Sequence, residues 1–129
     1  MRWQDFLEKL GYAVVVSESW SGDDAAMLIA LHAYRSYSSI MAFHTQQPDR
    51  PIVLVLTGTD LYRDMAVHSE VLHSMEIADQ LIVLQSSALD SIPAHLRHKA
   101  RVIYQSVQLD TPDAVMSTSF LVIVIGHLR

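Results

Sequence analysis

An uninterrupted apolar run, Ile52–Leu56, constrains the fold of this chain more than any other part of the sequence. The polar sequence Thr57–Asp60 follows it directly, and a helical pattern begins at about Met65. A short apolar run between turn residues is typical of a strand that is buried on both faces, as in a parallel sheet. Open α/β sheets bind their ligands at the carboxyl ends of such strands. We therefore predict a binding site at Thr57–Asp60.

Further apolar runs alternate with helical patterns along the chain. Trp3, Phe6, Leu7 and Leu10 are spaced as one face of a helix that ends at Gly11. Other helices are expected around residues 37–44 and 65–78. Strands are expected at Tyr12–Val16, Met27–Leu31, Ile52–Leu56, Leu81–Leu84, Val102–Tyr104 and Phe120–Ile125. This alternation predicts a Rossmann-like, three-layer α/β/α domain with a mostly parallel sheet.

The composition excludes several classes of protein. The chain has 129 residues, enough for one domain with a sizeable core, and its formal charge of −5 argues against nucleic acid as the main partner. No apolar stretch approaches the roughly 20 residues that a membrane-spanning helix needs, and no signal peptide begins the chain. Without cysteine there are no disulfides and no thiolate chemistry. We expect a cytoplasmic protein with no membrane span and no bound cofactor.

The seven histidines do not predict a metal site. His68 and His73 are five residues apart, and His95 and His98 are three apart. Neither pair comes with carboxylates in an arrangement such as HExxH. We therefore expect no bound metal.

Candidate substrate-binding side chains follow two of the predicted strands. His32 and Arg35 come after Met27–Leu31, and they should open onto the same edge of the sheet as Thr57–Asp60. Arg35 suits a phosphate-like anion because its guanidinium is a fixed fork of donors. The full set predicted to bind substrate is Thr57, Gly58, Thr59, His32, Tyr34, Arg35, Tyr62 and Arg63.

Asp60 is the candidate catalytic residue, either as a base or as the group that orients a nucleophile. A structural alternative stays open for the same segment. It could be an ordinary strand-to-helix turn, in which Gly58 gives backbone freedom and Asp60 or Asp64 caps the next helix. Position at the carboxyl edge of the sheet favours a functional role.

Several stretches resemble the amino-terminal half of a GT-B glycosyltransferase of the large group 1. Ile77–Gln85 resembles the family's "AD-x-hydrophobic strand", and Lys99–Val107 resembles the strand and turn that lead to its interdomain linker. Val124–Arg129 resembles the first strand and turn of its nucleotide-sugar-binding domain. Taken with Ile29–Ser36 and Leu56–Asp64, the set is similar to the subfamily that includes the selenosugar synthase of selenoneine biosynthesis.

The resemblance implies an acceptor-side domain over residues 1–105, a linker over 106–119 and the start of a donor domain over 120–129. It implies an enzyme that uses a nucleotide sugar and a small acceptor, with selenophosphate as one candidate. The family's first strand and donor-binding half are not represented here, so we expect an incomplete domain that is inactive alone. Two alternatives remain: a stand-alone Rossmann-like or flavodoxin-like binding module, and a non-catalytic fragment that self-associates.

The missing first strand predicts a hole in the sheet. In the doubly wound order, that strand lies between Tyr12–Val16 and Ile52–Leu56. Phe120–Ile125 is apolar on both faces and suits this slot. We therefore expect Phe120–Ile125 to fill it, in a homodimer that exchanges this strand.

Overall fold

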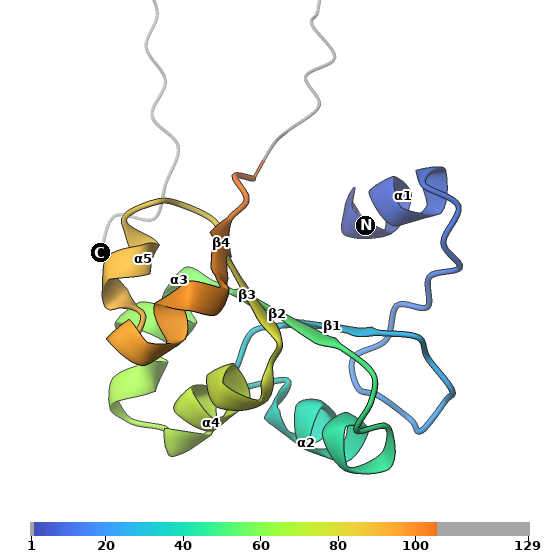
Figure 1. The fold of residues 1–129 in the computed structure, drawn as a ribbon, viewed down its shortest axis with the longest axis horizontal. Coiled ribbons are helices and arrows are strands. Elements are labelled where there is room, and N and C mark those ends of the chain that lie inside the picture. The colour runs from blue at the N-terminus through green and yellow to red at the C-terminus, as the bar shows by residue number, and fades with distance from the viewer. Residues whose placement is uncertain (1, 106–129) are drawn as a thin grey trace, which may run out of the picture.

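The computed structural model describes residues 2–105, which form an α/β fold with a four-stranded sheet (Figure 1). The sheet is parallel throughout and has the order β1-β2-β3-β4. Its strands are β1 (Leu28–Leu31), β2 (Ile52–Leu56), β3 (Gln80–Val83) and β4 (Ala100–Val102). The α-helices are α1 (Arg2–Lys9), α2 (Tyr37–Gln46), α3 (Gly58–Tyr62), α4 (Ser69–Ile77) and α5 (Ala88–Ser91), and the 3₁₀ helices are η1 (Asp64–Ala66) and η2 (Ala94–Lys99). The predicted parallel α/β class is confirmed.

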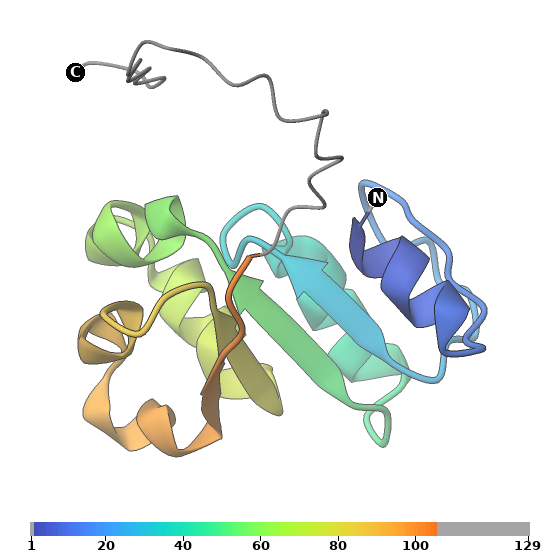
Figure 2. The same cartoon turned by 90° about the horizontal axis from the view of Figure 1, so that it is seen from above.

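The core lies between the sheet and the two longest helices that pack on it. Helices α2 and α4 contact each other and lie on one side of the strands, whereas α1 lies on the other side (Figure 1). Seen from above, β1 and β2 lie in front of these two helices (Figure 2). Phe43 of α2, Leu54 of β2 and Met75 of α4 are fully buried in this core. The apolar run that singled out β2 is therefore a central strand, as predicted.

The start of β2 is fixed by a polar contact with the beginning of β3. The Ile52 N–H donates to Asp79 Oδ2 at 2.7 Å, and the Asp79 N–H donates to the Ile52 carbonyl oxygen at 2.9 Å. This reciprocal pair sets the register in which Val53 lies opposite Gln80. The Asp79 carboxylate thus accepts a backbone N–H at the start of β2 that has no partner in the sheet ladder.

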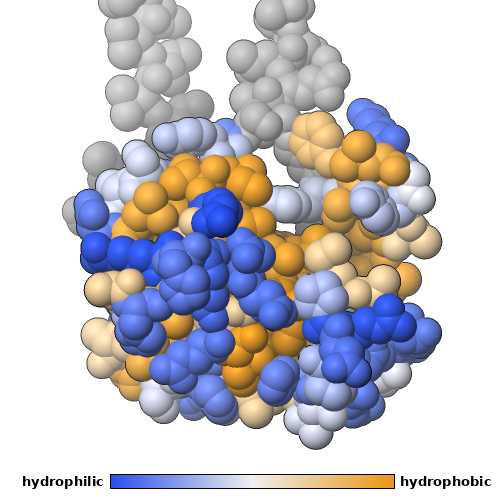
Figure 3. Space-filling model, in the orientation of Figure 1, coloured by the Kyte–Doolittle hydropathy of each residue, from blue (hydrophilic) through white to orange (hydrophobic). Residues whose placement is uncertain are grey.

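The predicted strand at Tyr12–Val16 is wrong, because this segment has no regular secondary structure. Val15 and Val16 are exposed, at 87% and 48%, although their composition is typical of a strand. Figure 3 shows apolar surface around this amino-terminal part, where Phe6 and Leu10 are also exposed. A β-branched run forms a strand only when a neighbouring edge and a packing surface are available.

The predicted hole beside Ile52–Leu56 is also wrong. β1 pairs directly with β2, with Leu28 opposite Ile52 and Leu31 opposite Val55, so no slot separates them. Two strands become neighbours when the segment that connects them can pack against the sheet. Here α2 connects β1 to β2, and the two strands lie side by side. The proposed role of Phe120–Ile125 in a strand-exchanged dimer lies outside the described residues.

Smaller differences concern where elements begin and end. Asp64 was expected to cap the helix that follows, but it begins the 3₁₀ helix η1, and the N-cap of α4 is His68. Thr57–Asp60 is not an open loop, because helix α3 already begins at Gly58. Within residues 2–105, no helix combines the length and apolar character needed to cross a membrane.

One buried hydrogen bond ties α4 to the turn that follows β1. The Ser74 hydroxyl donates to the Ala33 carbonyl oxygen at 2.9 Å, and both residues are completely buried. We expect Ser74→Ala to lower the free energy of unfolding by about 1–2 kcal/mol, because it leaves a buried carbonyl without a donor. Chemical denaturation measures the change, with Ser38→Ala on the exposed part of α2 as the control. Equal stability of the two variants would contradict this role for Ser74.

Candidate functional site

The carboxyl ends of β1 and β2 bring two predicted site segments together. Leu31 is paired with Val55, and the next residue, His32, donates its N–H to the Val55 carbonyl oxygen at 3.1 Å. This bond extends the ladder by one residue and places His32 beside the turn that leads from β2 into α3. The expectation that His32 and Thr57–Asp60 share one edge of the sheet is confirmed.

His32 has a backbone conformation that is rare for a residue with a side chain. Its φ is +78°, in the left-handed region, and no other described residue except glycine has a positive φ. Two bonds from Ser36 hold the turn: its N–H donates to the His32 carbonyl at 3.0 Å, and its hydroxyl donates to the Leu31 carbonyl at 2.8 Å. Residues held in this region cost free energy and are over-represented at functional sites.

Asp60 is the buried centre of the site, with no solvent exposure. Its Oδ2 accepts the Thr57 N–H at 2.7 Å and the Thr57 hydroxyl at 3.2 Å, as the acidic residue of a capping box does. Its Oδ1 lies 2.5 Å from Nδ1 of His32 and has no conventional hydrogen bond to any described residue. The Arg35 N–H donates to the same nitrogen at 3.4 Å, so Nδ1 has two polar neighbours, a carboxylate oxygen and a backbone donor.

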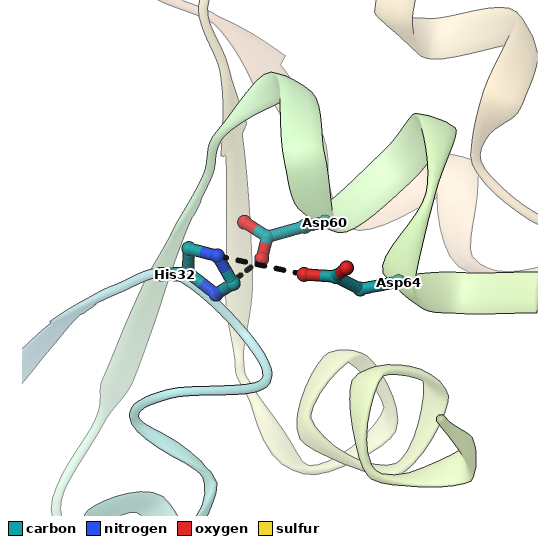
Figure 4. Close-up of side chains that lie close together, drawn as sticks. All are labelled: His32, Asp60 and Asp64. Carbon is teal, nitrogen blue, oxygen red and sulfur yellow. Dashed lines mark ion pairs between the residues drawn. The ribbon is translucent and has the colours of Figure 1, made fainter. Parts of the chain in front are cut away.

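The other ring nitrogen of His32 faces two oxygen atoms, of which the one from Asp64 is drawn in Figure 4. Nε2 lies 3.1 Å from the Thr59 hydroxyl oxygen and 3.6 Å from Asp64 Oδ2. The side chains of His32 and Asp64 are 12% and 8% exposed, so this nitrogen lies in a mostly dry position. In the tautomer that carries its proton on Nδ1, Nε2 presents a lone pair to which a hydroxyl group can donate.

Asp64 is held in its ionised form by its neighbour. The Arg63 Nε donates to Asp64 Oδ1 at 2.9 Å, and this bond lowers the pKa of the Asp64 carboxyl below its ordinary value. Burial acts in the opposite direction, while electrostatic interactions with Arg63, His32 and His68 add to the lowering. Asp64 therefore carries a negative charge throughout the neutral pH range.

The other predicted site residues lie around this cluster rather than in it. The Tyr34 ring stacks on His68 with centroids 4.0 Å apart, and Arg35 is exposed. Gly58 and Tyr62 line a shallow pocket of about 190 Å³ beside α5, where the Tyr62 hydroxyl accepts a bond from Gln85 at 3.0 Å. Gly58 has no positive φ, and an added Cβ would make only ordinary contacts, so backbone freedom is not the reason for this glycine.

Two features of the cluster were missed from the sequence. Asp64 was assigned only a capping role, and Asp60 had no identified partner. The spacing of four residues between Asp60 and Asp64 was an available signal, because such residues share a face when the chain is helical. The contact with His32 had no local signal, since 28 positions separate His32 from Asp60 in the sequence.

His32, Asp60 and Asp64 also form a possible metal-binding group. Each offers one ligand atom, and these atoms all lie within 4.8 Å of one another. No protein-family model matches the chain, and no curated protein matches it at a significant level. The resemblance to glycosyltransferases consequently rests on the sequence motifs alone.

Asp60 should contribute to stability as well as to the site. We expect Asp60→Ala to lower the free energy of unfolding by about 2 kcal/mol, because the Thr57 N–H at the start of α3 loses its acceptor. Thermal and chemical denaturation measure the loss. Asp49→Ala, in the exposed turn before β2, serves as the control and should change stability by less than about 0.5 kcal/mol. An Asp60→Ala chain as stable as this control would refute the capping role.

Proposed function

We propose that this chain is the acceptor-side domain of a nucleotide-sugar-dependent glycosyltransferase of the selenosugar-forming type. Its site is the cluster of His32 and Asp60 at the carboxyl edge of the sheet. The observation that carries the proposal is the contact of the His32 imidazole with a buried carboxylate, while Nε2 on the other side of the ring faces Thr59 and Asp64. The motif resemblance supplies the reaction class, and the edge of a parallel sheet is where such folds bind ligands.

Asp60 and His32 have different roles in this proposal. The Asp60 side chain is fully buried, so it cannot contact an acceptor and acts as a positioning residue. In this proposal His32 carries its ring proton on Nδ1, beside Asp60, and the carboxylate stabilises the imidazolium when Nε2 takes up a proton. His32 Nε2 is the group that contacts the acceptor and draws its proton.

The Thr59 hydroxyl indicates how an acceptor would bind. It lies 3.1 Å from Nε2, at the distance and with the chemistry of a substrate hydroxyl or a protonated nucleophile. An acceptor would replace this contact. Thr57 and Thr59 then remain as hydroxyl groups beside the reacting atom.

Charge limits which acceptors suit the site. Asp60 and Asp64 are both carboxylates, so a fully ionised acceptor meets repulsion that Arg63 offsets only in part, because its side chain is 68% exposed. An acceptor with a proton on its nucleophilic atom is therefore favoured. Selenophosphate meets this requirement when its selenium, the nucleophilic atom, is protonated.

The proposal is tested by titrating the ¹⁵N-labelled chain with selenophosphate and, separately, with a panel of nucleotide sugars. We expect selenophosphate to shift the amide signals of His32 and of Thr57–Asp60, and inorganic phosphate to shift them less. We expect the nucleotide sugars to bind poorly, because a GT-B enzyme builds its donor site on the other domain. The chain alone should show no transferase activity, since the reaction needs both walls of the cleft for positioning.

His32→Asn is the matched variant, because asparagine tolerates a positive φ but lacks the imidazole. It should abolish the selenophosphate-dependent shifts while leaving the melting temperature close to that of the unaltered chain. Two results would contradict the proposal: low-micromolar binding of a nucleotide sugar, or selenophosphate shifts that persist unchanged in His32→Asn.

A further inference from the structure

We propose that His32 and Asp64, supported by Asp60, form a binding site for a divalent transition-metal cation of the Zn²⁺ type. The three side chains meet at one point although they come from the end of β1, from α3 and from η1 (Figure 4). The proposal does not rest on the transferase activity, because cation binding is measured without an acceptor or a nucleotide sugar.

The distances at Nε2 match those of a metal site. Zinc bonds to imidazole nitrogen and carboxylate oxygen are about 2.0–2.1 Å long, which places neighbouring ligand atoms of a tetrahedral site roughly 3.3 Å apart. His32 Nε2 and Asp64 Oδ2 are 3.6 Å apart, and the Thr59 hydroxyl oxygen is 3.1 Å from Nε2. Small side-chain adjustments are enough for one cation to bind Nε2 and Asp64 Oδ2 together, with water at the remaining positions.

The contact between Asp60 and His32 places a carboxylate where a metal-bound histidine usually has one. A histidine that binds a metal through one nitrogen usually donates the other N–H to a carboxylate, which fixes the ring and makes it a better ligand. Asp60 Oδ1 lies 2.5 Å from Nδ1. Asp60 and the Arg35 N–H occupy Nδ1, whereas Nε2 faces Asp64 and is the proposed ligand atom.

Burial gives an independent reason to expect a cation here. Asp60 has no exposure, and apart from the contact with His32 its Oδ1 has no hydrogen bond within residues 2–105. Asp64 is also nearly buried, and its arginine partner, Arg63, is mostly exposed. Buried negative charge is costly unless it is paired, and a cation between His32 and Asp64 supplies the missing positive charge.

The ligand types favour one group of metals. An imidazole nitrogen suits Zn²⁺ and similar transition metals, whereas Mg²⁺ and Ca²⁺ prefer sites made of oxygen atoms alone. A cation at Nε2 occupies the lone pair that the transferase proposal assigns to the acceptor. Zn²⁺ should therefore compete with the acceptor for this site.

Calorimetric titration of the full chain with ZnCl₂ tests the proposal, with MgCl₂ as a comparison. We expect one site for Zn²⁺ and no comparable binding of Mg²⁺. His32→Asn and Asp64→Asn should each weaken Zn²⁺ binding more than 100-fold, and Asp60→Asn should weaken it by about 10–100-fold. His95→Asn and His98→Asn, on the exposed 3₁₀ helix η2, are the matched controls and should leave the affinity unchanged.

A measurement on the unaltered chain guards against variants that do not fold. In the ¹⁵N spectrum of the histidine side chains, Zn²⁺ should change the signals of His32 before those of the other histidines. Absence of Zn²⁺ binding, equal affinity in His32→Asn, or first changes at His95 or His98 would each overturn the proposal. If Zn²⁺ binds as expected but selenophosphate does not, only the transferase proposal fails.

Discussion

The direct parallel pairing of β1 with β2 is the contact on which the rest of the structure depends. It aligns Leu31 with Val55, so both strands end at the same level of the sheet. His32 continues the ladder by one bond and then turns sharply through a left-handed conformation. Without this pairing, His32 would not lie beside the first turn of α3.

Asp60 uses its two carboxylate oxygens for two different contacts. One carboxylate oxygen receives the N–H and hydroxyl of Thr57, which fixes the first turn of α3. The other oxygen lies against His32. The two interpretations left open by the sequence, a helix cap or a functional carboxylate, are therefore compatible, because each uses a different oxygen atom.

Electrostatics at this edge of the sheet favour positive or proton-bearing ligands. Two carboxylates converge with one imidazole in a mostly dry cluster, and Arg63 reaches it from the exposed side. The chain as a whole has a formal net charge of −5, so it carries no general excess of positive side chains to offset these carboxylates. The excess of negative charge in this cluster favours both proposed ligands, the protonated acceptor and the metal ion. Both ligands would use the lone pair of Nε2.

Local patterns determined the parallel α/β class and the position of the candidate site along the chain. The continuous apolar run at β2, the helical spacing at α2 and the polar residues after β2 required no knowledge of distant contacts. These signals are local because burial on both faces and helical periodicity depend on neighbouring residues. They sufficed to predict that His32 and Thr57–Asp60 share an edge.

Only the tertiary structure decided which strands are neighbours and which side chains meet. Tyr12–Val16 has the composition of a strand but no edge to pair with, and β1 occupies the position beside β2 that the doubly wound order assigned to another strand. The partnership of His32 with Asp60 and Asp64 likewise arises from strand pairing across a long sequence separation. Sequence patterns specify which residues seek burial or a partner, whereas the packing of the whole chain selects the partner that each one finds.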